Sequence, residues 1–443
     1  MRVKENDYER KLFAILLAGF LLKLCYIAVV PYGISKHDLG SFTLTGFSDT
    51  DEGHLGFISY LYTFRRLPDF DPRLIWGFYN PPGFHILAAL WYGINRRRGF
   101  APLTCLENLQ ILTLIFVSVG ICVTVKILEE LFEKDRYLLY TVAFLSFFPF
   151  FTILSGTLNN DALAFLCSMT AVLYAIRWYR DQSVKNIVLI AVSLGFGMFT
   201  KLNVGLLSFP IGFLFLYALV KRRKEAGKMI LQFGLFGLIC VPLGLFWPIR
   251  NYMRFGMPMN YIPDLKSKRQ YVGNFSIFQR IGIPSWENLS SPFLSFAPGQ
   301  EHNIWTQLVK TALFDEVPRP GEMPVFRMCA QMLFWLGLLG AACAVVSWIR
   351  TLLDRNSMAS ERKAFFTIQF LSMLIGYVPF CFSYPYICTM NFRYIIPLLL
   401  LPCLSWESIV HRAGERTRRL QTVGMLLFVF LCLLANLALI IME

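Results

Sequence analysis

Long apolar runs separated by short polar loops constrain this chain more than any other feature. Inside a bilayer every backbone N–H and C=O needs an internal partner, so only helices and closed barrels cross one. The runs are too continuous for the alternating pattern of barrel strands. Hydrophobic residues make up 56% of the chain and charged residues 16%, fewer charges than in a typical soluble domain. The sequence therefore predicts an all-α polytopic membrane protein.

Eleven apolar segments are interpreted as spanning helices, because about twenty residues cross a bilayer. They are Leu12–Val30, Leu106–Leu128, Tyr137–Leu154, Asp161–Trp178, Ile187–Phe199, Val204–Val220, Met229–Pro248, Phe326–Ile349, Phe365–Phe382, Tyr394–Ile409 and Val423–Ile441. A further apolar piece, Gly83–Ile94, is about half as long as a full span. We therefore expect a bundle of about 11–12 transmembrane helices, and whether Gly83–Ile94 crosses stays open.

Basic residues between these segments set the predicted orientation. With the N-terminus inside, four basic loops also lie inside, as the positive-inside rule requires. They are Arg177–Lys185, Lys221–Lys228, Arg350–Lys363 and Arg412–Arg419. The acidic loop 31–82 and the segment Arg250–Pro324 then lie outside. This assignment of loops to the two faces holds only if Gly83–Ile94 does not cross the membrane fully. We therefore interpret Gly83–Ile94 as a re-entrant or surface helix.

The net charge of +14 would suggest nucleic acid in a soluble protein. Here the basic residues lie between apolar runs, where they attract anionic lipid instead. We expect membrane lipid and no nucleic acid as a partner. The 11 cysteines form no CxxC pair, so neither a disulfide framework nor a zinc site is predicted. The short loops and the absence of a targeting signal favour a bacterial inner membrane, with the endoplasmic reticulum membrane as the alternative.

The chain is predicted to have three parts. Residues 1–249 form a transmembrane module that includes the outer loop 31–82, and residues 326–443 form the C-terminal transmembrane helices. Residues 250–325 lie between them and are rich in Pro, Ser, Asn and aromatic residues. This segment is too long for an idle connection and is predicted to fold as a small extracytoplasmic cap.

The outer loop carries an unusual density of acidic residues for so apolar a chain. Asp51 and Glu52 directly precede GHLGFISYLYTF, which has the pattern of an amphipathic helix and contains His54. This arrangement puts a carboxylate beside a membrane-surface helix, where a hydroxyl group of an acceptor could meet it. An ordinary solvated loop is the simpler interpretation of the same charges.

Other polar clusters occur where predicted spans meet the outer face. Each has a structural explanation of its own: Asn159–Asp161 as a helix N-cap, Lys201 as a snorkelling side chain, Arg393 and Tyr394 as interface anchors. With Asp51, Arg250 and the predicted topology, they place two carboxylates and three cations on one membrane face. Such a set suits a substrate that has a phosphate and a hydroxyl to be deprotonated.

The order of these motifs resembles the GT-C glycosyltransferases that use polyprenyl- or dolichyl-phosphate sugars, the family of protein mannosyltransferases and aminoarabinose lipid A transferases. The Asp51-Glu52 pair after the first span, followed by NPPGFH from Asn80, is similar to that family's first outer loop. Further similar segments are NNDALA, GFGMFTKLNVGLLSFP, WPIRNYMRFGMPMNY and MNFRYIIP. The likeness extends to about residue 262 and resumes near Asn391.

The resemblance implies transfer of a sugar from a polyprenyl-phosphate donor to a hydroxyl on a lipid, glycan or protein acceptor at the outer face, with inversion. Asp51 would be the general base, with Asp49 as the alternative, and Asp161 would hold hydroxyls of the sugar or acceptor. Lys201 and Arg393 would neutralise the departing phosphate. The remaining predicted substrate-binding residues are Glu52, His54, Arg250 and Tyr394. No cofactor is required, although a divalent metal on Asp51 and Glu52 is an option.

Two rival functions use the same residues. A transporter or flippase of lipid-linked sugars would use the cationic groove without chemistry, and predicts broken helices in corresponding halves. No such symmetry is visible in the sequence. A non-catalytic scaffold of the cell envelope predicts that Asp51 and Asp161 can both be replaced by Asn without loss.

Overall fold

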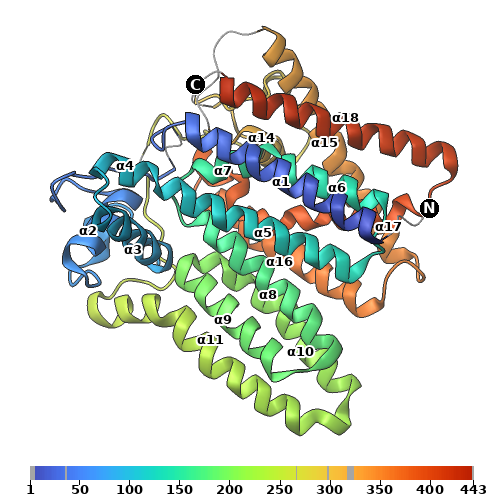
Figure 1. Ribbon diagram of the computed structural model, residues 1–443, viewed down its shortest axis with the longest axis horizontal. Helices are drawn as coiled ribbons and strands as arrows, with labels where there is room; N and C mark the ends of the chain where they lie inside the picture. Colours follow the sequence, from blue (N-terminus) through green and yellow to red (C-terminus); the bar gives the residue numbers. More distant parts are fainter. Residues whose placement is uncertain (1–4, 35–36, 266, 297–298, 317–323, 442–443) are drawn as a thin grey trace. The chain divides into compact units, whose positions relative to one another are not determined.

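The computed structural model describes residues 5–34, 37–265, 267–296, 299–316 and 324–441, and its helices are labelled in Figure 1. The α-helices are α1 (Glu5–Val29), α2 (Gly53–Phe64), α3 (Gly83–Arg97), α4 (Pro102–Glu107), α5 (Leu109–Leu131), α6 (Arg136–Phe147), α7 (Pro149–Gly156), α8 (Asp161–Asp181), α9 (Val184–Thr200), α10 (Ser208–Lys221), α11 (Ala226–Phe255), α12 (Ile277–Ile281), α13 (Trp286–Leu289), α14 (Ile304–Phe314), α15 (Pro324–Leu353), α16 (Ser360–Ser383), α17 (Leu400–Val410) and α18 (Glu415–Ile441). Short 3₁₀ turns join them: η1 (Pro72–Leu74), η2 (Leu202–Leu207), η3 (Arg223–Glu225), η4 (Ile387–Met390), η5 (Phe392–Tyr394) and η6 (Ile396–Leu399).

The predicted fold class is confirmed. Nine helices in the described part of the chain are long and apolar enough to cross a membrane. Two more predicted spans are shorter apolar helices, Val184–Thr200 and Ile396–Val410. Between them these helices cover all the predicted segments, and the described residues contain no strand beyond an isolated bridge from Tyr271 to Tyr386. The chain is therefore an all-α, multi-pass membrane protein, of the inner membrane in a bacterium or the endoplasmic reticulum membrane in a eukaryote.

Two compact units make up the chain. Unit 1 contains Met1–Val30, Thr124–Ile153 and Asp264–Glu443, whereas unit 2 contains Pro31–Val123 and Leu154–Pro263. The predicted division at 249/250 and 325/326 stays a prediction, and part of the predicted cap (266, 297–298 and 317–323) lies outside the described residues. The described part of the cap forms α12, α13 and α14.

Unit 2 is built on α8, α9 and α11, which lie side by side in Figure 1. Gly195 of α9 lets α11 approach closely, because a Cβ there would lie 3.0 Å from the carbonyl oxygen of Cys240. Near the other end of the same helices, the indole nitrogen of Trp178 donates to Gln232 at 2.7 Å. Close packing at one point and a buried polar bond at another fix how these helices align.

The helix predicted directly after Glu52 is also present, but its environment differs from the prediction. α2 begins at Gly53 and has the predicted length, yet every residue from Gly53 to Leu61 is buried. Its aromatic side chains pack inside the outer loop: Phe57 stacks on Phe78 with ring centroids 4.7 Å apart. Protein therefore covers α2 on nearly all sides, and α2 is not an open surface helix.

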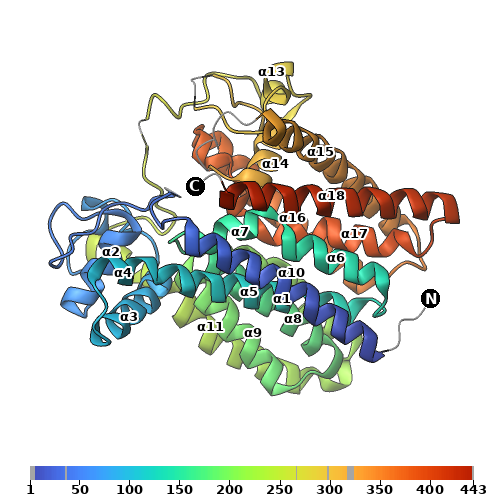
Figure 2. The ribbon, with the colours of Figure 1, turned by 45° about the horizontal axis from the view of Figure 1, so that its top comes forward.

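Unit 1 gathers α1, α6, α17 and α18, which Figure 2 shows packed together. Gly19 of α1 lies against Ser146 of α6, where a Cβ would come within 2.8 Å of the serine Cβ. Lys23 is buried one turn later, and its ammonium donates to the carbonyl oxygen of Ser146 at 2.6 Å. Asn436 of α18 donates to the carbonyl oxygen of Phe147 at 2.7 Å. Polar bonds to the end of α6 thus anchor both flanking helices.

Candidate functional site

The start of α2 is held by close contacts between backbone segments of the outer loop. Gly40 and Gly53 both have positive φ, +72° and +69°, where a Cβ is strained. A Cβ on Gly40 would lie 1.9 Å from the carbonyl oxygen of Glu52, and a Cβ on Gly53 would lie 2.5 Å from that of Asp38. Gly53 also donates its N–H to the carbonyl oxygen of Trp76 at 2.7 Å. The residues directly before α2 are therefore fixed by glycine-dependent packing.

Asp51 lies at this fixed point with its side chain turned inward. It is 1% exposed and accepts three hydrogen bonds: from the Thr43 hydroxyl at 2.7 Å, the Ser48 N–H at 3.1 Å and the Ser59 hydroxyl at 3.2 Å. All three donors are neutral. Asp51 is thus a buried carboxylate held in one orientation without an ion pair in the described part of the chain.

The other acidic residues of this loop point to solvent. Asp49 and Glu52 are exposed, and neither carboxylate accepts a hydrogen bond from the described residues. Asp51 and Glu52 are adjacent but turn in opposite senses, one into the protein and one out of it. The sequence could not separate Asp49 from Asp51, whereas the structure distinguishes them by burial and by hydrogen bonding.

His54 lies in the first turn of α2 and forms a buried pair with His85 of α3. His54 Nδ1 lies 2.8 Å from His85 Nε2, and the rings stack with centroids 5.1 Å apart. Burial, with a contribution from His54, lowers the pKa of His85 well below its usual value. Phe57 covers the other side of the His85 ring at 4.5 Å. His54 is therefore enclosed within the loop, where it positions α3 against α2.

Asp161 and Lys201 form an ion pair between two helix ends. Asp161 is the first residue of α8 and 1% exposed, and Lys201 follows the last residue of α9. The Lys201 ammonium donates to Asp161 Oδ1. Lys201 thus pairs with a buried carboxylate instead of snorkelling to the interface. The predicted N-cap at Asn159–Asp161 is present, since α8 starts directly after Asn160 and the Asn159 side-chain oxygen accepts the Asp161 N–H at 3.0 Å.

The beginning of α3 links these two groups within unit 2. Gly83 lies against the end of α9, where a Cβ would come within 2.7 Å of the Thr200 hydroxyl, directly before Lys201. His85 belongs to the same first turn and contacts His54 close to Asp51. One turn of α3 therefore touches both the loop that holds Asp51 and the helix end that carries Lys201.

Arg250 of α11 also reaches the outer loop. Its guanidinium donates to the carbonyl oxygen of Pro68 and to Asn251 at 2.8 Å, and lies 5.1 Å from the ring centroid of Trp247. Trp247 in turn donates to the carbonyl oxygen of Tyr79 at 3.0 Å. The donors of Arg250 are thus used within the protein, where they join α11 to the outer loop.

Arg393 and Tyr394 lie in unit 1, unlike the six other predicted site residues. Asn391 holds their segment by donating to Asp315 at 2.8 Å and accepting from the Arg393 N–H at 2.9 Å. The Arg393 guanidinium donates to the Tyr394 hydroxyl at 3.1 Å and lies 4.9 Å from its ring centroid. Arg393 is 6% exposed. Within its unit, this arginine is a buried cation ordered by its neighbours.

Sequence reasoning missed the neutral donors around Asp51. Ser59 follows Asp51 by eight residues and lies in the second turn of α2, the helix that the sequence predicts directly after Glu52. Thr43 precedes Asp51 by the same eight residues, but it lies outside any helix and is brought to Asp51 by the path of the loop. No local pattern indicated it.

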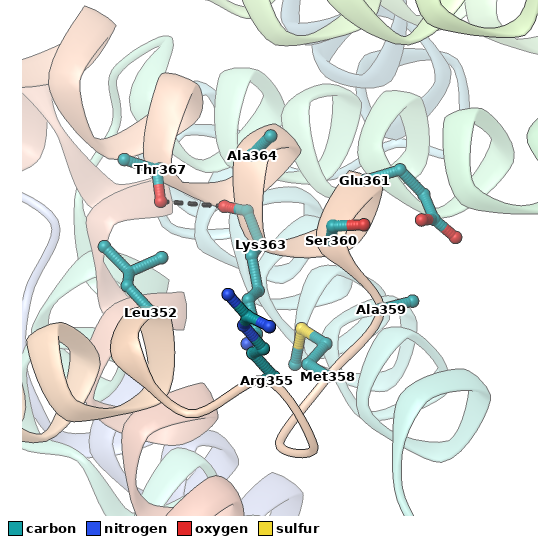
Figure 3. Close-up of a pocket in the computed structure, with 9 residues that line it drawn as sticks. All are labelled: Leu352, Arg355, Met358, Ala359, Ser360, Glu361, Lys363, Ala364 and Thr367. Atoms are coloured by element: carbon teal, nitrogen blue, oxygen red, sulfur yellow. Dashed lines mark hydrogen bonds between the residues drawn. The ribbon is translucent and has the colours of Figure 1, made fainter.

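A cavity of about 700 Å³ lies elsewhere, between the end of α15 and the start of α16 (Figure 3). Its lining residues are Leu352, Arg355, Met358, Ala359, Ser360, Glu361, Lys363, Ala364 and Thr367. None of them is a predicted site residue, and the loop was predicted to be inside. This cavity is therefore not part of the candidate site, because the two share no residue and are predicted to face opposite sides of the membrane.

Comparisons with known proteins support the predicted resemblance. The family model "Dolichyl-phosphate-mannose-protein mannosyltransferase" matches residues 104–247. This segment contains Asp161 and Lys201, whereas Asp51 lies outside it. The resemblance to lipid-phosphate-sugar-dependent membrane glycosyltransferases is confirmed on this basis. No curated protein matches the sequence.

Two solved structures are also similar to this chain, both of ArnT from Cupriavidus metallidurans. The form bound to undecaprenyl phosphate is 13% identical, with 91% of this chain and 77% of that chain covered and a TM-score of 0.39. The apo form is 15% identical, with 74% and 66% covered and a TM-score of 0.33.

Proposed function

We propose that this protein is a membrane glycosyltransferase that moves a sugar from a polyprenyl-phosphate donor to an acceptor hydroxyl at the predicted outer face. The observation that carries the proposal is Asp51, a buried carboxylate fixed by three neutral donors without a cation. The family match over residues 104–247 supports the donor class. The acceptor would be a lipid, a glycan or a protein.

In the proposed reaction Asp51 accepts the proton of the acceptor hydroxyl as its oxygen attacks the anomeric carbon. The bond from that carbon to the phosphate oxygen breaks, and polyprenyl phosphate leaves with the bonding electrons. Attack from the side opposite the phosphate inverts the anomeric carbon. General-base assistance of this kind contributes roughly 10²- to 10⁴-fold. Asp49 is a weaker choice because its exposed carboxylate has no fixed orientation.

Charge on the departing phosphate requires cations, and stabilising such charge is a large catalytic term. Lys201 is proposed for this role because its partner Asp161 fixes the ammonium at a helix end. Asp161 is proposed to hold sugar or acceptor hydroxyls. Arg393 and Tyr394 stay predicted substrate-binding residues, and Arg250 is the weaker candidate because its donors bind Pro68 and Asn251.

The Asp51–Glu52 pair does not fit a shared divalent metal. The Asp51 oxygens already accept three hydrogen bonds, and the Glu52 carboxylate points to solvent. No step of the proposed reaction is therefore assigned to a metal there. Glu52 and His54 are proposed to act at the edge of the substrate site, Glu52 through its exposed carboxylate and His54 by positioning α2.

The test measures donor turnover. Purified protein in detergent is mixed with polyprenyl-phosphate sugars, mannose and aminoarabinose first, and released polyprenyl phosphate is quantified with and without a panel of hydroxyl acceptors. Wild type should release it, Asp51→Asn should not, and Asp49→Asn should behave like wild type. Equal release by Asp51→Asn would overturn the assignment of the base. Tight donor binding without release under any condition, unchanged in Asp51→Asn, would favour the transporter function.

A further inference from the structure

Three metal-ligating side chains of unit 1 meet where α6 begins and α17 ends. Asp135 directly precedes α6, Glu407 lies in the last turn of α17, and His411 follows that helix. His411 Nε2 lies 3.7 Å from Asp135 Oδ2 and 3.9 Å from Glu407 Oε2. One ligand atom from each residue falls within 4.8 Å of the other two. The three ligand atoms would have to move closer together to bind a common ion.

Each carboxylate is held by one oxygen and presents the other to the cluster. Asp135 Oδ1 accepts the N–H groups of Tyr137 and Leu138 at 2.8 and 3.1 Å, so Oδ2 faces His411. Glu407 Oε1 accepts from the Thr141 hydroxyl. Metal-ligating carboxylates typically have one oxygen on the metal and the other in a hydrogen bond that fixes the orientation of the side chain.

The remaining oxygen of Glu407 is the observation that points to a ligand. Glu407 is 1% exposed, and its Oε2 has no hydrogen-bond partner in the described part of the chain. A buried carboxylate oxygen that accepts no hydrogen bond, with only an imidazole 3.9 Å away, is costly. The same oxygen is directed at the imidazole, on the side where Asp135 Oδ2 also lies. A bound cation would satisfy both oxygens at once.

His411 supplies both a ligand and access to solvent. Its ring packs edge-on against Tyr137, with centroids 5.3 Å apart and an interplanar angle of 90°, which limits its rotation. Its side chain is 39% exposed, so water can complete a coordination sphere. An imidazole with two carboxylates suits Zn²⁺, Mn²⁺ or Fe²⁺ better than Ca²⁺ or Mg²⁺, which prefer oxygen ligands alone.

We propose that Asp135, Glu407 and His411 form a binding site for a divalent first-row transition metal ion that joins the start of α6 to the end of α17. The flanking basic loops place this site on the predicted inner face. It is independent of the proposed glycosyl transfer. The rival explanation is a metal-free cluster in which the nearby Glu407 carboxylate, which raises the pKa of His411, holds the ring protonated.

The experiment uses the full-length protein in detergent, with any affinity tag removed and metals stripped by a chelator. Mn²⁺ is the first probe because the free cysteines of the chain bind Zn²⁺ more readily than Mn²⁺. Free Mn²⁺ is counted by electron paramagnetic resonance during a titration, and Zn²⁺ content after dialysis is measured by mass spectrometry. Thermal unfolding is followed in parallel with and without each ion.

Two variants probe the site, and a third controls for charge. Asp135→Asn keeps an acceptor for the Tyr137 and Leu138 N–H groups, so α6 stays capped while a charged ligand is lost. His411→Gln removes the nitrogen ligand from a half-exposed position. Glu415→Gln removes one exposed carboxylate nearby that pairs only with Arg419 among the described residues.

Wild type and Glu415→Gln should bind about one ion per chain and unfold at a higher temperature with metal. Asp135→Asn and His411→Gln should bind at least tenfold more weakly, with unfolding temperatures that no longer respond to the ion. Failure of both ions to bind wild type, or equal binding by all four proteins, would overturn the proposal. Circular dichroism and size-exclusion profiles equal to wild type establish that each variant is folded.

Discussion

Two buried carboxylates of unit 2, Asp51 and Asp161, have the same exposure of 1% and different partners. Asp51 is held by two hydroxyls and one backbone N–H, and no cation neutralises it in the described residues. Asp161 is paired with the ammonium of Lys201. A carboxylate beside a cation is already neutralised, whereas one oriented by neutral donors keeps its negative charge.

The two regions also differ in what fixes them. The Asp51 region depends on glycines that let backbone segments touch, and its chemistry comes from a loop within about ten residues. The Asp161 region depends on two helix ends, forty residues apart in sequence, that meet through an ion pair and the bond from Asn160 to the carbonyl oxygen of Thr200. We therefore expect substitutions in the first region to affect turnover most, and those in the second to affect stability as well.

The largest expected effect follows from removing the proposed base. Asp51→Asn keeps the shape and can still accept hydrogen bonds, but it cannot take a proton, so release of polyprenyl phosphate should fall roughly 10²- to 10⁴-fold. Turnover is measured at equal amounts of folded protein. The matched control is Asp49→Asn, which should lose little. If Asp161→Asn abolished turnover while Asp51→Asn retained it, Asp51 would not be the base, and the proposed difference between the two carboxylates would be wrong.

Breaking the ion pair should have the next largest effect. Lys201→Met removes the ammonium that pairs with the buried Asp161 carboxylate, so the free energy of unfolding should decrease by about 3–5 kcal/mol. Thermal unfolding in detergent provides the measurement. The double variant Asp161→Asn with Lys201→Met removes both charges and should recover most of that stability. A double variant as unstable as Lys201→Met would mean that the pair is not the reason for the loss.

A smaller effect is expected from the glycine that starts α2. Gly53→Ala adds a Cβ at positive φ and 2.5 Å from the carbonyl oxygen of Asp38, so the loop must shift. The left-handed strain alone costs roughly 1–2 kcal/mol, and turnover should fall because Asp51 moves with the loop. Gly33→Ala is the control, since a Cβ there meets nothing within 4 Å. Equal unfolding temperatures for the two variants would contradict the role of close backbone packing.

The smallest effect is expected from one neutral donor of Asp51. Ser59→Ala removes a hydrogen bond to the carboxylate worth about 1 kcal/mol, which corresponds to a loss of turnover of about fivefold. Ser48→Ala is the matched control, because Ser48 binds Asp51 through its backbone N–H and not through its hydroxyl. If both serine variants behave alike, the orientation of Asp51 does not depend on its side-chain donors.

The sequence determined the class of the molecule and much of its secondary structure. Apolar runs of a given length and the start of α2 after Glu52 are local features, because helix formation in a membrane depends on hydrophobicity and backbone hydrogen bonding along one segment. The resemblance to lipid-phosphate-sugar transferases was likewise readable from the motifs, and the family match supports it over residues 104–247.

Tertiary structure alone decided which charged groups meet. Nothing local distinguishes Asp51 from Asp49, yet the path of the loop buries one and exposes the other. Lys201 could have snorkelled to the interface, but the packing of α8 against α9 gives it Asp161 as a partner. Asp135 comes to lie beside His411, far along the chain, because α6 packs against α17. Such pairs depend on distances in space, and a sequence pattern specifies only distances along one helix or strand.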